Sequence, residues 1–122
     1  LGVLDEWTER RRAVAIAYNE GLAESSLILP HVPEWADPVW HLYVVRTSDR
    51  DTLQDRMTEA GIGTLIHYPT PPHMQQAYSG LQIAPNRLPL AQTLASEVFS
   101  LPVGPHLHDM GAKYVISNVA TK

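Results

Sequence analysis

The chain has 122 residues, of which 44% are hydrophobic and 18% charged, a size and composition that predict one globular domain over residues 1–122. Its formal net charge of −4 argues against nucleic-acid binding, because a phosphate-binding surface needs clustered Lys and Arg. The absence of cysteine excludes disulfides and thiolate chemistry, and no apolar run approaches the roughly 20 residues that a membrane span needs, so we expect a cytoplasmic protein without membrane contact.

The first predicted element is a helix over residues 1–26. Large apolar side chains recur there at helical spacing, with Arg11 filling one slot of the same stripe: Leu4, Trp7, Val14, Tyr18 and Leu22. A helix with two aromatic residues on one face needs a partner surface. That partner is either the sheet of the same domain or a second copy of the chain in a homodimer, with Trp7 as a candidate anchor.

Strand signals follow this helix. Residues 27–29 predict a short strand before a proline-rich connection, and residues 39–46, VWHLYVVR, predict the strongest strand of the chain. The second segment is apolar along almost its whole length, so we expect both of its faces to be covered, as in a central strand. His41, which lies within it, is then expected to be a hydrogen-bonded core residue and not a ligand.

A helix and a further strand are predicted next. Residues 47–63 form the helix, with Ser48 or Asp49 as its N-terminal cap and Gly61 at the left-handed position that ends it. Residues 62–69, IGTLIHYP, form the strand, which stops at a proline because proline cannot donate to a ladder. Strand, helix and strand together predict a βαβ-like unit, although a long loop would also return the second strand antiparallel.

The last third of the chain predicts two helices around a short strand. After a loop with one helical turn near residues 74–78, a helix begins near Pro89 and has a buried stripe of Leu90, Leu94 and Val98. Residues 100–103 predict a short edge strand. A closing helix over residues 106–122 has an apolar side made of Ala112, Val115, Ile116 and Val119.

The sequence lacks the common catalytic motifs. The sequence has no glycine-rich phosphate loop, no Gly-x-Ser-x-Gly elbow and no acid pair typical of glycosidases. Its two lysines, Lys113 and Lys122, lie in the closing helix, where a desolvated Schiff-base amine is not expected. The paired histidines near residues 67–73 and 106–108 fall short of the four-ligand pattern of a closed metal site. We therefore assign no catalytic residue and no metal site.

His67 and Tyr68 form the strongest binding feature of the sequence. They end a predicted buried strand, where loops meet and binding sites are often built. The imidazole can hydrogen-bond a phosphate or a hydroxyl group, and the tyrosine offers a ring face and a donor. From these residues alone, ligand contact and structural packing are equal alternatives.

The order of several motifs resembles a known family. In chain order these motifs read ERRR, EGL, VWHLYVVR, GIGTLIHYPTPPHMQQAY and SLPV. Any one of them is weak, but the last two together are highly specific. The series, from about residue 4 to about residue 119, resembles the C-terminal part of the DegT/DnrJ/StrS family of pyridoxal-phosphate-dependent sugar aminotransferases, which make amino sugars on nucleotide carriers.

The resemblance implies the small C-terminal domain of a fold-type-I aminotransferase, an α/β (α+β) sandwich in which helices back a small, mostly antiparallel sheet. It also implies that His67 and Tyr68 reach toward a nucleotide-sugar substrate, with His73 as a neighbouring substrate-binding position. Arg46 and Arg50 match common residues of the family. A purely structural role stays open for both of these arginines.

The family's N-terminal domain, with the lysine that binds pyridoxal phosphate, has no counterpart in these 122 residues. We therefore expect the chain alone to bind no cofactor and to be inactive in transamination. Its start at Leu1 fits a truncated or excised C-terminal domain. The alternative is a free-standing module that associates with itself or with a full-length aminotransferase, and a third reading is a metal-binding or purely structural domain.

Overall fold

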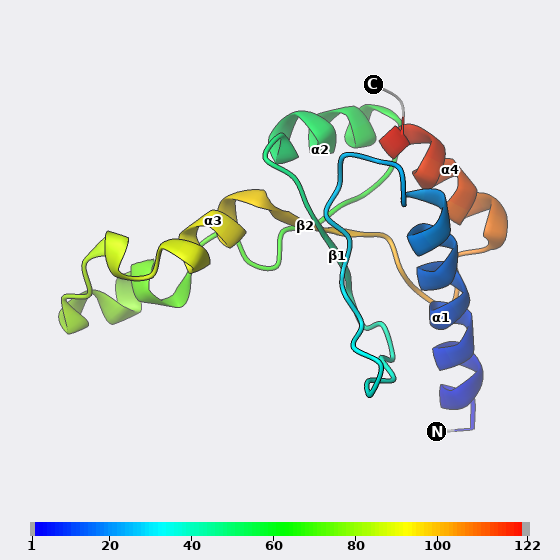
Figure 1. Ribbon diagram of the computed structural model, residues 1–122, viewed down its shortest axis with the longest axis horizontal. Helices are drawn as coiled ribbons and strands as arrows, with labels where there is room; N and C mark the ends of the chain where they lie inside the picture. The colour runs from blue at the N-terminus through cyan, green and yellow to red at the C-terminus, as the bar shows by residue number, and fades with distance from the viewer. Residues whose placement is uncertain (1, 121–122) are drawn as a thin grey trace.

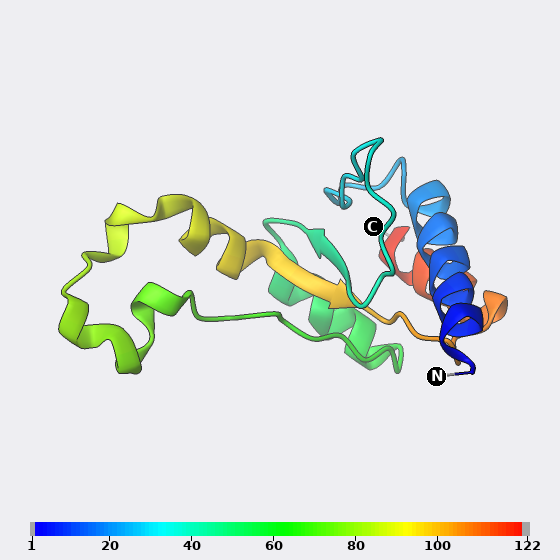
Figure 2. The ribbon, with the colours of Figure 1, turned by 90° about the horizontal axis from the view of Figure 1, so that it is seen from below.

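The structure, a computed structural model, describes residues 2–120 and has two parts (Figure 1). Helices α1 (Leu4–Gly21), α2 (Arg50–Glu59) and α4 (Asp109–Ala120) lie against a small sheet. The arm, residues 69–97, projects away from them as the green and yellow segment of Figure 2. It contains three short 3₁₀ helices and one α-helix: η1 (Pro72–Met74), η2 (Gln76–Leu81), η3 (Pro85–Arg87) and α3 (Pro89–Glu97).

Two antiparallel strands form the sheet. Strand β1 (Tyr43–Arg46) pairs with β2 (Val98–Leu101), so that Tyr43 lies opposite Leu101. Alternate residues of β1 are buried, as are the last three residues of β2. The expected small antiparallel sheet with helices against it is confirmed.

Two isolated bridges extend this sheet, one on each side. Ile28 pairs with Arg46 and Leu65 pairs with Ser100, both antiparallel. The continuous strand predicted over residues 62–69 is therefore wrong, because only Leu65 exchanges backbone hydrogen bonds with the sheet. Strand β2 is antiparallel both to β1 and to the segment at Leu65, so this segment runs parallel to β1 and is separated from it by β2. The βαβ-like unit exists only in that reduced form.

Strand β1 is shorter than the sequence predicts. Residues 39–42 lie outside it, because Trp40 has a φ of 50° and so leaves the extended conformation just before the strand. His41 is consequently exposed. The expectation that His41 is a core residue is wrong for this reason.

The stripe predicted on α1 is buried in its second half only. Val14, Tyr18 and Leu22 lie in the core, whereas Leu4 and Trp7 are about half exposed. The sheet of the same domain therefore covers only the later part of the stripe. The start of the helix keeps an apolar face that no described residue covers fully.

Arg11 occupies the position where the stripe of α1 changes from exposed to buried. Its Nη1 donates to the backbone carbonyl oxygens of Trp40 at 3.2 Å, His41 at 3.4 Å and Val103 at 3.3 Å. These carbonyls belong to the segments before β1 and after β2. A charged side chain in an apolar slot thus ties α1 to the end of the sheet where β1 begins and β2 stops.

Helix α2 ends as the sequence predicts, but the predicted side-chain cap by Ser48 or Asp49 at its start is wrong. Gly61, beyond its C-terminus, has a φ of 74°, which confirms the expected left-handed residue. Asp49 occupies the N-cap position, but its side chain makes no capping bond. Instead its backbone N–H donates to the Thr47 hydroxyl at 3.2 Å.

One hydrophobic core joins the sheet to the three helices around it. Its largest fully buried side chains are Tyr18, Leu22, Tyr43, Val45, Met57 and Phe99. The predicted apolar side of α4 is confirmed, since its buried or partly buried members are Ala112, Val115, Ile116 and Val119.

The arm has no core of its own. Helix α3 buries none of its residues, and Leu90 is 66% exposed, so the buried stripe predicted on this helix is wrong among the described residues. Other apolar side chains of the arm are exposed as well: Met74, Tyr78, Leu81, Ile83 and Leu88. An apolar surface of this extent is typical of a segment that packs on a partner.

Candidate functional site

The His67 side chain lies against β2. Its Nδ1 is 2.8 Å from Ser100 Oγ, and Ser100 is buried, with 5% of its surface exposed. The backbone holds the two residues together, because the Ser100 N–H donates to the Leu65 carbonyl at 2.7 Å. The histidine that the sequence singles out therefore has a hydrogen-bond partner fixed in the sheet.

A small open pocket of about 180 Å³ surrounds this pair. Two imidazoles line it, those of His67 and His41, which come from the segments after α2 and before β1. Its remaining walls are mostly apolar and include Leu42, Leu65, Leu101, Pro102 and Val103. Apolar walls with a few placed polar groups are the usual composition of a ligand pocket.

Tyr68 faces a different hollow. Its side chain is 73% exposed, and its ring meets the His67 ring edge-on with the centroids 5.5 Å apart. The hollow has a volume of about 450 Å³ and is also lined by Pro69, Thr70, Met74, Gln75 and Gln76. His67 and Tyr68 therefore line two separate hollows, next to the point where the arm begins.

His73 lies apart from both hollows. It belongs to η1 and lines neither of them. Its Nε2 is buried and has no hydrogen-bond partner within residues 2–120. Of the three substrate-binding residues expected from the sequence, the structure brings His67 and Tyr68 together and leaves His73 separate.

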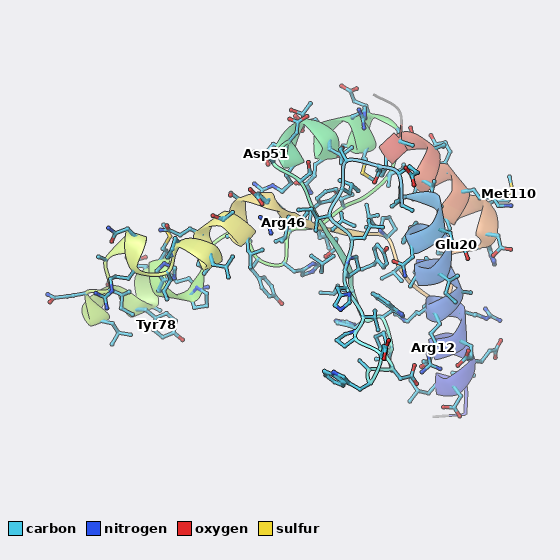
Figure 3. The ribbon with its side chains drawn as sticks, in the orientation of Figure 1. Arg12, Glu20, Arg46, Asp51, Tyr78 and Met110 are labelled. Carbon is cyan, nitrogen blue, oxygen red and sulfur yellow. The ribbon has the colours of Figure 1, made fainter. Side chains whose placement is uncertain are left out.

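Arg46 and Arg50 hold the base of the arm. The Arg46 guanidinium pairs with the carboxylate of Glu97, and Arg50 Nη1 donates to the Ala95 carbonyl at 2.6 Å. Both partners lie in the last turn of α3, where unpaired carbonyls favour cations. Figure 3 shows Arg46 where this helix meets the sheet. The contacts within the chain therefore give both arginines a structural role.

Two further hollows lie away from His67 and Tyr68, and one of them is larger than either hollow that these residues line. One, of about 400 Å³, sits between the ends of α1, α2 and α4 and is lined in part by Glu24, Asp49 and Arg56. The other, of about 650 Å³, runs along the start of α1 and is lined in part by Leu4, Trp7, Val39 and His41. Neither contains His67 or Tyr68, so size alone does not select the binding site.

The described part of the chain offers no other clear chemical centre. Within residues 2–120, no three His, Asp or Glu side chains gather as a metal site requires. No helix in the same range has the length and apolar character to cross a bilayer. Lys113 is exposed on α4, and Lys122 lies outside the described residues.

Ser100 is the residue that sequence reasoning missed. The sequence pattern places it in a short strand and gives it no role. A single hydroxyl within the apolar run VFSLPV was the available signal, because a buried hydroxyl needs a hydrogen-bond partner.

Nearly the whole chain matches one protein family. Residues 1–120 match the model of the DegT/DnrJ/EryC1/StrS aminotransferase family. The chain is 46% identical over 120 residues to the dTDP-3-amino-3,4,6-trideoxy-alpha-D-glucose transaminase of Streptomyces venezuelae, covering 98% of this chain and 32% of that protein. It is also 46% identical over 117 residues to the erythromycin biosynthesis sensory transduction protein EryC1 of Saccharopolyspora erythraea, covering 95% of this chain and 32% of that protein.

A solved structure shares this fold. DesV of S. venezuelae, in complex with a ketimine intermediate, superposes with a TM-score of 0.95 at 45% identity, over 98% of this chain and 33% of that chain. The putative sugar aminotransferase Spr1654 of Streptococcus pneumoniae shares the fold and has been solved in a PMP form and a PLP form; the PMP form has a TM-score of 0.84 at 25% identity, over 93% of this chain and 30% of that chain. This chain spans about a third of the length of the curated relatives that it matches.

Proposed function

This chain belongs to the DegT/DnrJ/EryC1/StrS aminotransferase family, and on that premise we propose that it is the C-terminal domain of a PLP-dependent nucleotide-sugar aminotransferase. In this role it contributes substrate-binding side chains, while the reacting amine comes from another part of the enzyme. The observation that carries the proposal is the His67 imidazole, which Ser100 holds at an open pocket.

The proposed substrate is a sugar linked to a nucleoside diphosphate, with dTDP as the nucleotide. Support comes from the name of the S. venezuelae relative, a transaminase of a dTDP-linked amino sugar. Diphosphates and sugars are rich in oxygen acceptors, which an imidazole N–H and a phenol O–H can bind. His67 and Tyr68 provide these two donors next to each other.

The described residues do not fit pyridoxal phosphate by themselves. A Schiff-base lysine must be desolvated so that its amine is neutral, whereas Lys113 is exposed on α4. When bound, this cofactor supplies an electron sink for amino-group transfer. We derive no such step from this chain, and we propose that the cofactor lysine belongs to a cofactor-binding domain that packs against the arm.

The surface area of the chain supports a packing partner. The folded chain exposes 8442 Å², whereas a compact monomer of this mass exposes about 6,600 Å². The excess is comparable with one partner's share of a large, permanent interface. Among the described residues, six of the 18 exposed large hydrophobic side chains lie on the arm, none of whose large side chains is in the core, so we propose that the arm packs on the cofactor-binding domain of a full-length aminotransferase.

A titration of the 122-residue chain with dTDP-glucose tests the binding role. We expect saturable binding that His67→Ala weakens by about tenfold, because a hydrogen bond to a charged oxygen contributes about 1.5 kcal/mol. His31→Ala, on an exposed loop, is the matched control and should bind like the wild type. Absence of binding, or equal weakening by both substitutions, would contradict the proposal.

A second test concerns catalysis. The purified chain should show no transamination of a dTDP-sugar and no aldimine absorbance when pyridoxal phosphate is added. Turnover by the 122-residue chain alone would overturn the division of roles proposed above.

A free-standing binding module is the second candidate function. The observation that favours it is the name of the S. erythraea relative, which describes a sensory transduction protein. Such a module would associate with itself or with a full-length aminotransferase. Adding the chain to a full-length family enzyme separates the candidates: a stable complex with an altered KM favours the module, and no effect on the complete enzyme favours the C-terminal domain.

A further inference from the structure

We propose that Ser100 positions His67 by fixing which ring nitrogen carries the proton. In this arrangement Nδ1 accepts a hydrogen bond from the Ser100 hydroxyl, and Nε2–H is the donor that faces a ligand. The inference rests on the proposed function, because it concerns the side chain proposed to contact the nucleotide-sugar. Ser100 acts through His67 and does not itself touch the ligand.

Burial limits what the Ser100 hydroxyl can do. The residue is 5% exposed and sits in β2 with backbone partners on both sides, Val44 in β1 and Leu65 beyond the other edge. Within residues 2–120 the hydroxyl has one hydrogen-bond partner, Nδ1 of His67 at 2.8 Å. Among the described residues, the hydroxyl proton therefore has one acceptor, Nδ1 of His67.

The direction of this bond follows from counting protons. If Nδ1 carried the imidazole proton, it would donate to Ser100 Oγ, and the hydroxyl proton would have no acceptor among the described residues. If Nδ1 is unprotonated, the hydroxyl donates to it and no buried donor is left over. The second arrangement is favoured, and the proton of the neutral imidazole of His67 then lies on Nε2.

The tautomer determines what kind of ligand atom can face the ring. An Nε2–H group donates, so its partner must be an acceptor, either a diphosphate oxygen or an oxygen of the sugar. A protonated amino group, which only donates, does not match it. Ser100 thereby makes the pocket selective for oxygen over ammonium at the position that His67 contacts.

NMR of the 122-residue chain labelled with nitrogen-15 histidine reads the tautomer, at a pH of about 8.5 where imidazoles are ordinarily neutral. His67→Gln removes one set of ring signals and so assigns them. We expect Nε2–H in the wild type, with an Nδ1 resonance displaced by the hydroxyl bond. Ser100→Ala should abolish this displacement and Ser100→Thr should keep it. Ser96→Ala, which removes an exposed hydroxyl bonded to the Thr93 carbonyl, should leave it unchanged.

Binding of dTDP-glucose and of dTDP, measured in parallel, gives a second readout. Ser100→Ala should raise the Kd for dTDP-glucose about three- to tenfold, and Ser100→Thr should restore it. If the Kd for dTDP rises equally, the oxygen that accepts from His67 Nε2–H lies on the diphosphate. If only the Kd for dTDP-glucose rises, that oxygen lies on the sugar.

An Nδ1–H tautomer in the wild type overturns the inference, as does a ring spectrum that Ser100→Ala leaves unaltered. If Ser100→Ala does not fold, the displaced Nδ1 resonance of the wild type, kept in Ser100→Thr, decides. Absence of dTDP-glucose binding together with a Ser100-dependent Nε2–H tautomer would reject the proposed function and retain the positioning role. Binding with the opposite tautomer would reject the positioning role and retain the function.

Discussion

The aromatic rings of Tyr18 and Tyr43 lie in the core with their centroids 5.0 Å apart and their planes inclined by 58°. Tyr18 Oη donates to the Pro102 carbonyl at 2.7 Å, and Tyr43 Oη donates to Asn19 Oδ1 at 2.6 Å. The pair thus joins α1 to β1 and to the segment after β2. Because Pro102 also lines the pocket of His67, these bonds connect the core to the candidate site.

Removing the Tyr18 hydroxyl should weaken the fold. Tyr18→Phe is expected to lower the free energy of unfolding by about 1–2 kcal/mol, because it removes a buried donor from the Pro102 carbonyl. Tyr114→Phe is the matched control: its hydroxyl donates to the Ala60 carbonyl at 3.0 Å, but its side chain is half exposed, so the loss should stay below about 0.5 kcal/mol. Urea denaturation followed by tryptophan fluorescence measures both, and equal losses would contradict the expectation.

Alkaline pH should destabilise the fold through the same two tyrosines. Burial raises the pKa of Tyr43 to about 12, and burial, with a smaller contribution from Tyr43, raises the pKa of Tyr18 well above its usual range. Above a pH of about 10 the unfolded chain releases these protons while the folded chain keeps them. The stabilisation is therefore complete below pH 10 and is lost as the pH rises toward the folded-state pKa values.

Urea midpoints at a pH of about 8 and of about 11 check this dependence on the two tyrosines. The midpoint should be lower at the higher pH, and Tyr18→Phe should reduce the difference. A midpoint that stays constant or rises would show that the buried tyrosines do not control alkaline stability.

Loosening the base of the arm should expose it to proteolysis without unfolding the core. Arg46→Ala removes the ion pair with Glu97 at the end of α3, which is partly exposed and should contribute less than about 1 kcal/mol to global stability. Cleavage within residues 69–97 should nevertheless become several-fold faster, because the arm lacks a core that would restrain it. Limited proteolysis with mass spectrometry locates the cuts. The control is Arg10→Ala, because Arg10 pairs with Glu6 within α1, away from the arm. This substitution should not change the cleavage sites or their rate.

The start of α1 should mediate self-association. Trp7, together with Leu4 and Val39, lines the hollow of about 650 Å³ and is 46% exposed. Trp7→Ser should shift the chain toward monomer in light scattering at high concentration, because a partly exposed aromatic side chain is a typical interface anchor. Trp35→Ser, at an 87% exposed tryptophan outside that hollow, should have no such effect. A wild-type chain that is strictly monomeric would reject this interface.

The helices of the core were predictable because their signals are local. Spacing alone identified the buried side of α4, and Gly61 marked the end of α2 through a requirement for positive φ that glycine meets at no steric cost. The motif order also predicted the family, which the match over residues 1–120 confirms.

The sheet and the pocket depend on contacts between distant residues, and there the sequence was less informative. Pairing of β1 with β2 and the single bridge at Leu65 have no local signature. The left-handed Trp40, which exposes His41, interrupts a run whose composition is typical of a strand. The bond between His67 and Ser100 likewise depends on the strand register.

Helix α3 shows why the spacing of apolar residues predicted the helix correctly but predicted its burial wrongly. Leu90 and Leu94 recur at helical spacing, and the helix forms over Pro89–Glu97. Spacing predicts which side of a helix is apolar but does not say which surface covers that side. For α3 the described residues cover this side only in part, and Leu90 stays exposed.

Leu65 and Ser100 exchange backbone hydrogen bonds, so the chain departs into the arm and returns from it at neighbouring points of the sheet. The two ends of the arm are held together by this pairing. The length of the arm can therefore vary widely, because the entropic cost of closing a loop rises only slowly with the number of residues in it. Insertions and deletions within the arm can therefore change the surface that the arm contacts, while the sheet and the helices α1, α2 and α4 keep their structure.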